Sequence, residues 1–213
     1  MSAEQQWDYS FDVVVVGSGN GGMTAALCSY EMGAKDVLVI EKSNLYGGTS
    51  SISGGGVWIP CNRYANEAGA GDTLESAKTY LRQLITEEEV PEHQLDAYLE
   101  NGPKMVDFLH ERTRMRYVTL EHYPDYYTNL DGAMQGHRSM EPETFNADEL
   151  GEEWRRLRRT HPMMHLAGVI GFTQVEAGLL IGQQPGWWKT AIKLVVDYAV
   201  DIPWRLKDKF HRR

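Results

Sequence analysis

The first pattern in the chain that could do chemistry is a glycine turn, Gly17-Ser18-Gly19-Asn20-Gly21-Gly22, with the spacing G-x-G-x-x-G. In such a turn the first glycine permits a tight bend, and the second lets a diphosphate approach the backbone. The third lets a helix pack closely against a strand. Amides at the start of the following helix attract phosphate groups. The pattern therefore predicts a binding site for the diphosphate of a dinucleotide.

Two elements must flank this turn for the motif to work, a strand before it and a helix after it. A strand is expected over residues 11–16, because it ends in four consecutive valines of the kind that fill central parallel strands. Apolar side chains recur at helical spacing over residues 21–32, which predicts the helix. The sequence VLVI at residues 37–40 predicts a second strand and completes a βαβ unit.

Glu41 ends the second predicted strand, where a carboxylate can accept hydrogen bonds from ribose hydroxyls and repel a 2′-phosphate. A loop at residues 47–56 then offers five glycines and four hydroxyl side chains, which are abundant hydrogen-bond donors to a ligand. An extended ligand could run from the glycine turn along this loop, which favours FAD over NAD. A flexible linker is the alternative, but the apolar run at residues 57–60 argues for an ordered loop.

The string FDVVVVGSGNGGMTAA, followed by VLVIEKSNLYGGTSSISGGGVWIP, resembles the N-terminal part of FAD-dependent 3-ketosteroid Δ1-dehydrogenases. More broadly, it resembles flavoproteins of the fumarate reductase and succinate dehydrogenase type. The strings GGTS and SGGGVWIP favour the steroid dehydrogenases, and the similarity continues through residues 73–110 and into HYPDYY at 122–127. The resemblance implies an α/β, Rossmann-like FAD-binding domain with a parallel sheet and helical insertions, incomplete at its C-terminus.

The resemblance also implies how the cofactor, FAD, is bound. The implied contacts are Gly17, Gly19 and Gly22 at the diphosphate, Glu41 at the adenosine ribose, and Gly48, Thr49, Ser50, Ser53, Gly54 and Gly55 along the ribityl chain and flavin ring. Ser18, Asn20, Gly21 and Lys42 complete the expected cofactor-binding set. Members of the family remove two hydrogens from ring A of a 3-keto steroid. A tyrosine takes a proton from C2, and the flavin N5 receives a hydride from C1.

Tyr126, in the string Pro124-Asp125-Tyr126, matches an active-site tyrosine of the family and is the implied catalytic residue of this chain. A phenol has an unperturbed pKa of about 10, so it needs a polarising partner to act near neutral pH. As a hydrogen-bond partner for a second phenol, Tyr126 would make chemical sense. An aromatic patch of Tyr123, Tyr126 and Tyr127 that covers the substrate or the core is an equally good alternative.

The family's proton-abstracting tyrosine, its ketone-polarising groups and the strands that complete its FAD domain belong to later segments. The chain is therefore expected to be a fragment, a truncated product or one part of a split enzyme whose second chain supplies the missing catalytic part. The expected substrate is a 3-keto steroid or a similar apolar ketone. Two alternatives stay open: a fumarate-reductase-like flavoprotein, with residues 135–138 as its candidate site, and a non-catalytic FAD-binding subunit.

Composition limits the remaining functions. The net charge of −9 disfavours nucleic acid as a partner, and two cysteines are too few for a disulfide scaffold. The chain shows no signal peptide and no apolar run of transmembrane length, so a cytoplasmic protein is expected. His161 and His165 have a metal-like spacing, but Pro162 interrupts the helix between them and no metal site is expected.

The charge changes sign along the chain, from an acidic excess in residues 1–150 to a basic excess in residues 151–213. The first part is expected to hold the FAD-binding βαβ unit, the glycine-rich loop and a helical insertion, and the second a helical segment of the same domain. The remaining local expectations are an Asp72–Glu75 capping box, a helix opened by Pro91 and broken at 101–103, a strand at 116–120, a loop-rich stretch at 121–147, and helices at 148–159 and 187–200.

Overall fold

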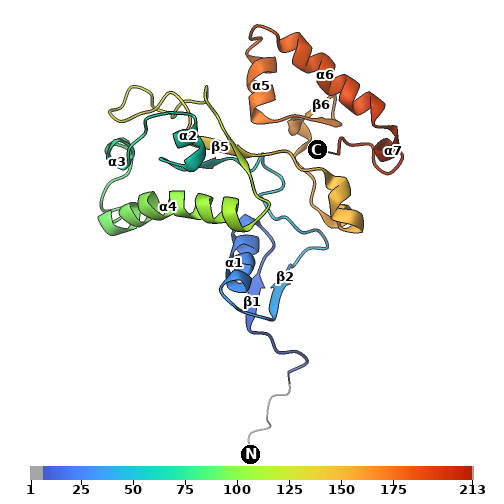
Figure 1. Ribbon diagram of the computed structural model, residues 1–213, viewed down its shortest axis with the longest axis horizontal. Helices are drawn as coiled ribbons and strands as arrows, with labels where there is room; N and C mark the ends of the chain where they lie inside the picture. Colours follow the sequence, from blue (N-terminus) through green and yellow to red (C-terminus); the bar gives the residue numbers. More distant parts are fainter. Residues whose placement is uncertain (1–6, 213) are drawn as a thin grey trace, which may run out of the picture. The chain divides into compact units, whose positions relative to one another are not determined.

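The computed structural model describes residues 7–212, which form two compact units, each built from two segments of the chain (Figure 1). Within the described residues, the first unit runs over 7–53 and 147–164. The second unit runs over 54–146 and 165–212. Both units are therefore interleaved in the sequence.

A βαβ element forms the first part of the first unit. Strands β1 (Val13–Val16) and β2 (Val37–Ile40) pair in parallel, and Val13 lies opposite Val37. Helix α1 (Asn20–Glu31) joins the strands and packs against both of them (Figure 1). The strand–helix–strand arrangement predicted around the glycine turn is confirmed.

The second part of this unit consists of two 3-10 segments, Ala147–Arg156 and Pro162–Met164. A single helix over 148–159 is a wrong prediction, because Gly151 adopts φ 57° and ψ −135° and interrupts it. No side chain of Ala147–Arg156 is buried, so no packed face stabilises an α-helix there.

A three-stranded antiparallel sheet lies in the second unit, with the order β3 (Val57–Trp58), β5 (Ser139–Pro142) and β4 (Tyr117–Thr119). The predicted strand near 116–120 is confirmed as β4. Strand β5 falls in the stretch predicted to be loop-rich; it is only four residues long, and its buried positions do not alternate with exposed ones. Both Met140 and Glu141 are buried, so hydrophobic periodicity could not find this strand.

Three helices cover the first segment of this unit: α2 (Arg63–Glu67), α3 (Leu74–Arg82) and α4 (Glu92–Arg112). The predicted break near 101–103 is wrong, because α4 continues through Pro103. Proline removes one helical hydrogen bond, but a continuous buried stripe holds both halves of the helix in line. This stripe consists of Leu95, Leu99, Gly102, Val106 and Leu109.

The capping box predicted at Asp72 and Glu75 is also wrong. The N-cap of α3 is Thr73, whose hydroxyl accepts a hydrogen bond of 3.1 Å from the amide of Ser76. The Asp72 carboxylate is instead used in an ion pair with Arg138. A tertiary contact therefore displaces the local cap by one residue.

Short strands and helices make up the second segment of this unit: β6 (His165–Leu166), β7 (Ile170–Gly171), α5 (Gln174–Ile181), α6 (Trp187–Val200) and α7 (Ile202–Arg205). The helix predicted at 187–200 is confirmed as α6. Helix α5 begins with a capping box between Thr173 and Glu176. Its first amides, of Gln174 and Val175, also donate to the buried carboxylate of Glu141 in β5.

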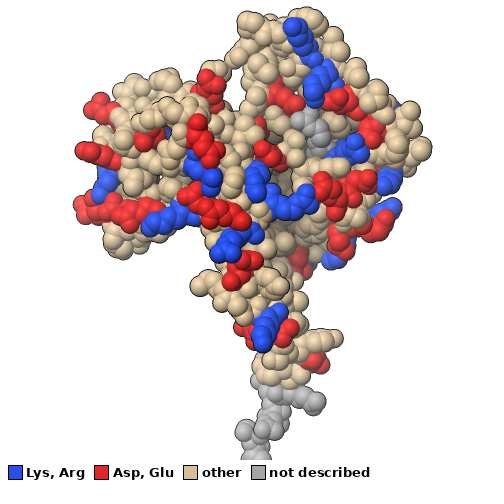
Figure 2. All heavy atoms as spheres, in the orientation of Figure 1, with Lys and Arg blue, Asp and Glu red and all other residues tan. Residues whose placement is uncertain are grey.

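Acidic and basic side chains are interspersed on the face drawn in Figure 2. Lys78, for example, pairs with both Glu92 and Asp96, and Arg63 pairs with Glu67.

In the part of the chain that is described, no helix combines the length and the apolar character needed to cross a membrane.

Candidate cofactor-binding site

The glycine turn begins directly after β1 and ends in the first turn of α1. Gly17 adopts φ +97°, a conformation that favours glycine, and its amide donates to the carbonyl of Ile40 at 2.7 Å. Gly19 is the N-cap of α1 and provides no side chain to cap the helix. The bend predicted from the first glycine is therefore present, and it is tied to the end of β2.

Within the turn, Gly22 is the glycine at which a side chain would be least tolerated. A Cβ atom there would lie 2.0 Å from the carbonyl oxygen of Gly17 and 3.5 Å from Cγ1 of Val15. At the neighbouring Gly21, a Cβ atom would meet nothing within 4 Å. Close packing of helix on strand thus depends on Gly22, as the motif predicts.

The second glycine loop lies against the first turn. A Cβ atom on Gly48 would lie 2.9 Å from the Cα atom of Gly19, so the two backbones are in direct contact. The amide of Gly47 donates to Ser18 Oγ at 3.1 Å, and the amide of Asn20 donates to Ser50 Oγ at 3.0 Å. The glycine turn and the first part of the loop, up to Ser53, are therefore brought together within one unit.

Glu41 connects the end of β2 to the glycine turn. Its Oε2 accepts hydrogen bonds from the hydroxyl of Ser18 at 2.5 Å and from the Ser18 amide at 3.1 Å, and its Oε1 accepts one from the amide of Ser43 at 3.0 Å. The Ser18 hydroxyl, followed by the two amides, lowers the pKa of Glu41 from 4.5 to about 2. A carboxylate accepts about four hydrogen bonds, so a ribose hydroxyl can bind beside these three.

We expect the Glu41 carboxyl group to titrate with a midpoint near pH 2. Because its pKa is lowered by folding, its contribution to stability is present above the unfolded pKa and is lost as the pH falls through about 2. Carboxyl ¹³C shifts measured by NMR give this midpoint. Ser18→Ala should raise it toward 4.5, and a midpoint already near 4.5 in the unaltered chain would contradict the hydrogen-bonding scheme.

A cavity of about 610 Å³ lies over the turn. Its lining contains ten of the predicted cofactor-binding residues: Gly17, Ser18, Gly19, Asn20, Gly21, Glu41, Lys42, Gly48, Thr49 and Ser50. Val16, Ile52 and Arg158 also line it and are not among the predicted residues. Arg158 lies in the run WRRLRR, which by itself indicates only a charged surface, so no local signal singles it out.

Four predicted cofactor-binding residues lie outside this lining. Gly22 packs behind the turn, and the hydroxyl of Ser53 donates to the carbonyl of Ser50 at 3.1 Å. Gly54 and Gly55 belong to the second unit. Gly55 adopts φ +70°, and a Cβ atom there would lie 3.0 Å from Cγ of Pro142.

The chemistry of the cavity fits the diphosphate of FAD. Glycines leave the backbone uncovered where Gly19 and Gly48 meet, and the N-terminus of α1 contributes partial positive charge. Among the described residues, the amide of Gly21 has no hydrogen-bond partner. Lys42 and Arg158 add two positive side chains to the lining. The residues present can therefore hold an anionic dinucleotide.

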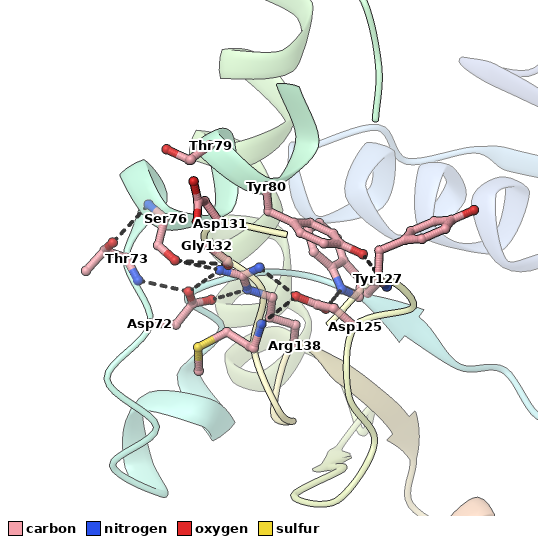
Figure 3. A network of polar contacts seen from close by, with 12 residues as sticks. Asp72, Thr73, Ser76, Thr79, Tyr80, Asp125, Tyr127, Asp131, Gly132 and Arg138 are labelled. Carbon is pink, nitrogen blue, oxygen red and sulfur yellow. Dashed lines mark hydrogen bonds and ion pairs between the residues drawn. The ribbon is translucent and has the colours of Figure 1, made fainter. Parts of the chain in front are cut away.

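Tyr126, the implied catalytic residue, lies in the second unit and is 84% exposed. The residues on either side of it are anchored. The buried carboxylate of Asp125 accepts from Trp58 Nε1 at 2.7 Å, and the amide of Tyr127 donates to the Tyr80 hydroxyl at 3.3 Å (Figure 3). The phenol is thus carried by a fixed backbone and lies outside the buried core.

The anchor of Asp125 is a buried ion-pair network centred on Arg138 (Figure 3). The guanidinium group binds both carboxylate oxygens of Asp72, at 3.0 and 2.7 Å, and donates to Asp125 Oδ2 at 2.8 Å. It also lies 5.6 Å from the ring centre of Trp58 and 5.8 Å from that of Tyr80. The Arg138 side chain is 1% exposed, so its charge is compensated entirely within the protein.

Tyr123 is a phenolic partner of Tyr126. A hydrogen bond with Tyr126, together with partial burial, raises the pKa of Tyr123 above its usual value of 10.

Residues 135–138 were the candidate site for a fumarate-reductase-like enzyme. Because Arg138 is buried and already paired with Asp72 and Asp125, it is not available to bind a dicarboxylate.

Among the described residues, no group of three or more His, Cys, Asp or Glu side chains is arranged to hold a metal ion.

A family model for the FAD binding domain matches residues 12–184 of this chain. The chain belongs to this family of FAD-binding domains, and its cofactor is FAD. The α/β, Rossmann-like fold expected from the sequence is confirmed.

Within the family, this chain is similar to steroid dehydrogenases. It is 43% identical over 160 residues to a 3-oxosteroid 1-dehydrogenase of Mycobacterium tuberculosis H37Rv, covering 75% of this chain and 28% of that protein. It is 35% identical over 212 residues to a 3-oxosteroid 1-dehydrogenase of Comamonas testosteroni, covering 99% of this chain and 36% of that protein.

A solved structure shares the same fold. The 3-ketosteroid Δ1-dehydrogenase of Sterolibacterium denitrificans, in complex with 1,4-androstadiene-3,17-dione, superposes with a TM-score of 0.88 and 42% sequence identity. The match covers 95% of this chain and 35% of that one. This chain thus spans about a third of the length of the relatives it matches.

Proposed function

We propose that this chain is the FAD-binding part of an oxidoreductase that removes two hydrogens from ring A of a 3-keto steroid or a similar apolar ketone. The observation that carries the proposal is the backbone contact between Gly19 and Gly48 beside Glu41, which makes an uncovered cradle for a long anionic cofactor. Similarity to three steroid dehydrogenases supports the substrate class.

In this proposal the cofactor follows the chain from the turn to the second loop. The turn from Gly17 to Gly21 binds the diphosphate, Gly22 lets α1 pack closely behind it, and Glu41 binds the adenosine ribose; Lys42 completes the set. The ribityl chain and flavin ring lie along Gly48, Thr49, Ser50, Ser53, Gly54 and Gly55. Bound FAD supplies an acceptor for the hydride that leaves the substrate.

Tyr126 is proposed as the active-site phenol of this chain. The side chain of the preceding residue, Asp125, is buried and bound by Arg138 and Trp58. A phenol in this position can donate a hydrogen bond to a second phenol and lower the cost of ionising it. Tyr126 therefore positions and polarises a proton-abstracting tyrosine instead of taking the proton itself.

The proton-abstracting tyrosine and the groups that polarise the ketone are proposed to come from segments outside this chain, either its continuation or a second chain. Residues 1–150 and 151–213 are proposed to belong to one FAD domain that those segments complete. This chain matches only about a third of the length of its relatives, which supports the proposal that other segments supply these groups.

The proposal is tested with the purified 213-residue chain. We expect a yellow protein with flavin absorbance, and slow or absent dye reduction when a 3-keto steroid and an artificial electron acceptor are added. Adding the rest of a related steroid dehydrogenase as a separate chain should restore dye reduction. If the combined chains oxidise a reduced dye with fumarate but do not reduce a dye with steroid, the proposed substrate class is contradicted. A chain that binds no FAD would contradict the proposal altogether.

A further inference from the structure

The segment that follows Gly151 is tied to the second glycine loop by backbone hydrogen bonds. The amide of Arg158 donates to the carbonyl of Tyr46 at 2.8 Å, and the amide of Tyr46 donates to the carbonyl of Arg156 at 2.9 Å. Farther along, the amide of His161 donates to the carbonyl of Ile52 at 3.0 Å. The segment therefore runs beside both ends of the loop that packs on the turn, and Arg158 is fixed next to it.

The Arg158 side chain lines the 610 Å³ cavity together with the glycine turn. Its Nε atom is buried and has no hydrogen-bond partner among the residues that the structure describes. A buried donor without a partner is costly, which points to a ligand atom at this place. Two arginines of the same segment differ: Arg155 and Arg156 are more than half exposed and pair with nearby glutamates.

The charges in the cavity indicate what kind of ligand atom this is. The ionisable side chains of the lining are Glu41, Lys42 and Arg158. The Glu41 carboxylate accepts hydrogen bonds from Ser18 and Ser43, and among the described residues no ion pair joins it to Arg158. Two cations and the N-terminus of α1 outweigh the charge of this one carboxylate, and this arrangement favours an anion.

We infer that Arg158 is a further cofactor-binding residue, and that its guanidinium group binds the diphosphate of FAD together with the amides of the glycine turn. This inference rests on the proposed function, because it requires FAD in the cavity. A guanidinium group presents a planar fork of donors that matches phosphate oxygens, and such charged hydrogen bonds are about twice as strong as neutral ones.

The test compares FAD and ADP binding to the unaltered chain and to Arg158→Ala, Arg158→Lys and Arg155→Ala. FAD affinity is measured by quenching of flavin fluorescence, and ADP affinity by competition with FAD. We expect Arg158→Ala to weaken FAD binding about ten- to hundredfold, and ADP binding by the same factor. Arg158→Lys should lose less, since it keeps a point charge, and Arg155→Ala should bind as the unaltered chain does.

Three outcomes would overturn the inference. Equal FAD affinity in Arg158→Ala and in the unaltered chain would show that Arg158 does not contact the cofactor, while leaving the proposed function intact. A loss for FAD without a loss for ADP, or no competition by ADP, would place the contact away from the diphosphate. No FAD binding by the unaltered chain would overturn both proposals. Circular dichroism monitors folding, and if Arg158→Ala does not fold, Arg158→Lys with unchanged affinities is the overturning result.

Discussion

Gly22→Ala is expected to destabilise the chain by about 1–3 kcal/mol, a usual cost of overpacking, and to abolish FAD binding. The new Cβ atom would start 2.0 Å from the carbonyl oxygen of Gly17, which is far inside van der Waals contact. Relief requires α1 to move away from β1, and this movement would open the turn that holds the diphosphate. Urea unfolding measures the first effect, and flavin fluorescence measures the second.

Gly21→Ala is the matched control for this prediction. It lies one residue away on the same helix, and its Cβ atom would meet nothing within 4 Å. Alanine is favoured over glycine in a helix by about 0.5–1 kcal/mol, so this variant should be slightly more stable than the unaltered chain. Equal effects of the two substitutions would contradict the packing role assigned to Gly22.

Arg138→Met is expected to lower the free energy of unfolding by about 3–5 kcal/mol, because it leaves two buried carboxylates without their counterion. Asp72 and Asp125 are both almost fully buried, and Arg138 forms four hydrogen bonds with Asp72, Asp125 and Ser76. Since Asp125 precedes Tyr126, the loop carrying Tyr126 should also become more mobile. Equilibrium unfolding in urea and hydrogen exchange of this loop measure the two effects.

The control for Arg138 is Arg63→Met, which removes an ion pair at the surface. Arg63 pairs with Glu67 and Asp107, whose side chains are 59% and 49% exposed. Surface pairs contribute about 0–1 kcal/mol, so Arg63→Met should be nearly neutral. A similar small loss for Arg138→Met would mean that the buried network is not a determinant of stability.

The cofactor cradle could be predicted from the sequence because its physics is local. A run of valines, a glycine turn and an apolar helical repeat leave few alternatives to a βαβ unit, and Glu41 follows at the end of its second strand. The second glycine loop was expected near the turn because one ligand must reach both. The structure places the two segments together, because the backbones of Gly19 and Gly48 are in direct contact.

Tertiary contacts explain what could not be predicted. Asp72 has the right neighbours for a helix cap, but Arg138, 66 residues later, uses its carboxylate. Pro103 has the local properties of a helix breaker, yet packing of the buried stripe keeps α4 continuous. Arg158 is one of four arginines in a short basic run, and its place in the lining of the cavity over the glycine turn distinguishes it. In each case the deciding partner is distant in the sequence.

The most direct measurement is an amide NMR titration of the ¹⁵N-labelled chain with FAD. If the diphosphate binds between the N-terminus of α1 and the second glycine loop, the amide resonances of residues 17–21 and 48–50 will shift together and saturate. Amides of α6 serve as an internal reference and should stay unchanged. Saturable shifts confined to other parts of the chain, with residues 17–21 unmoved, would contradict the account.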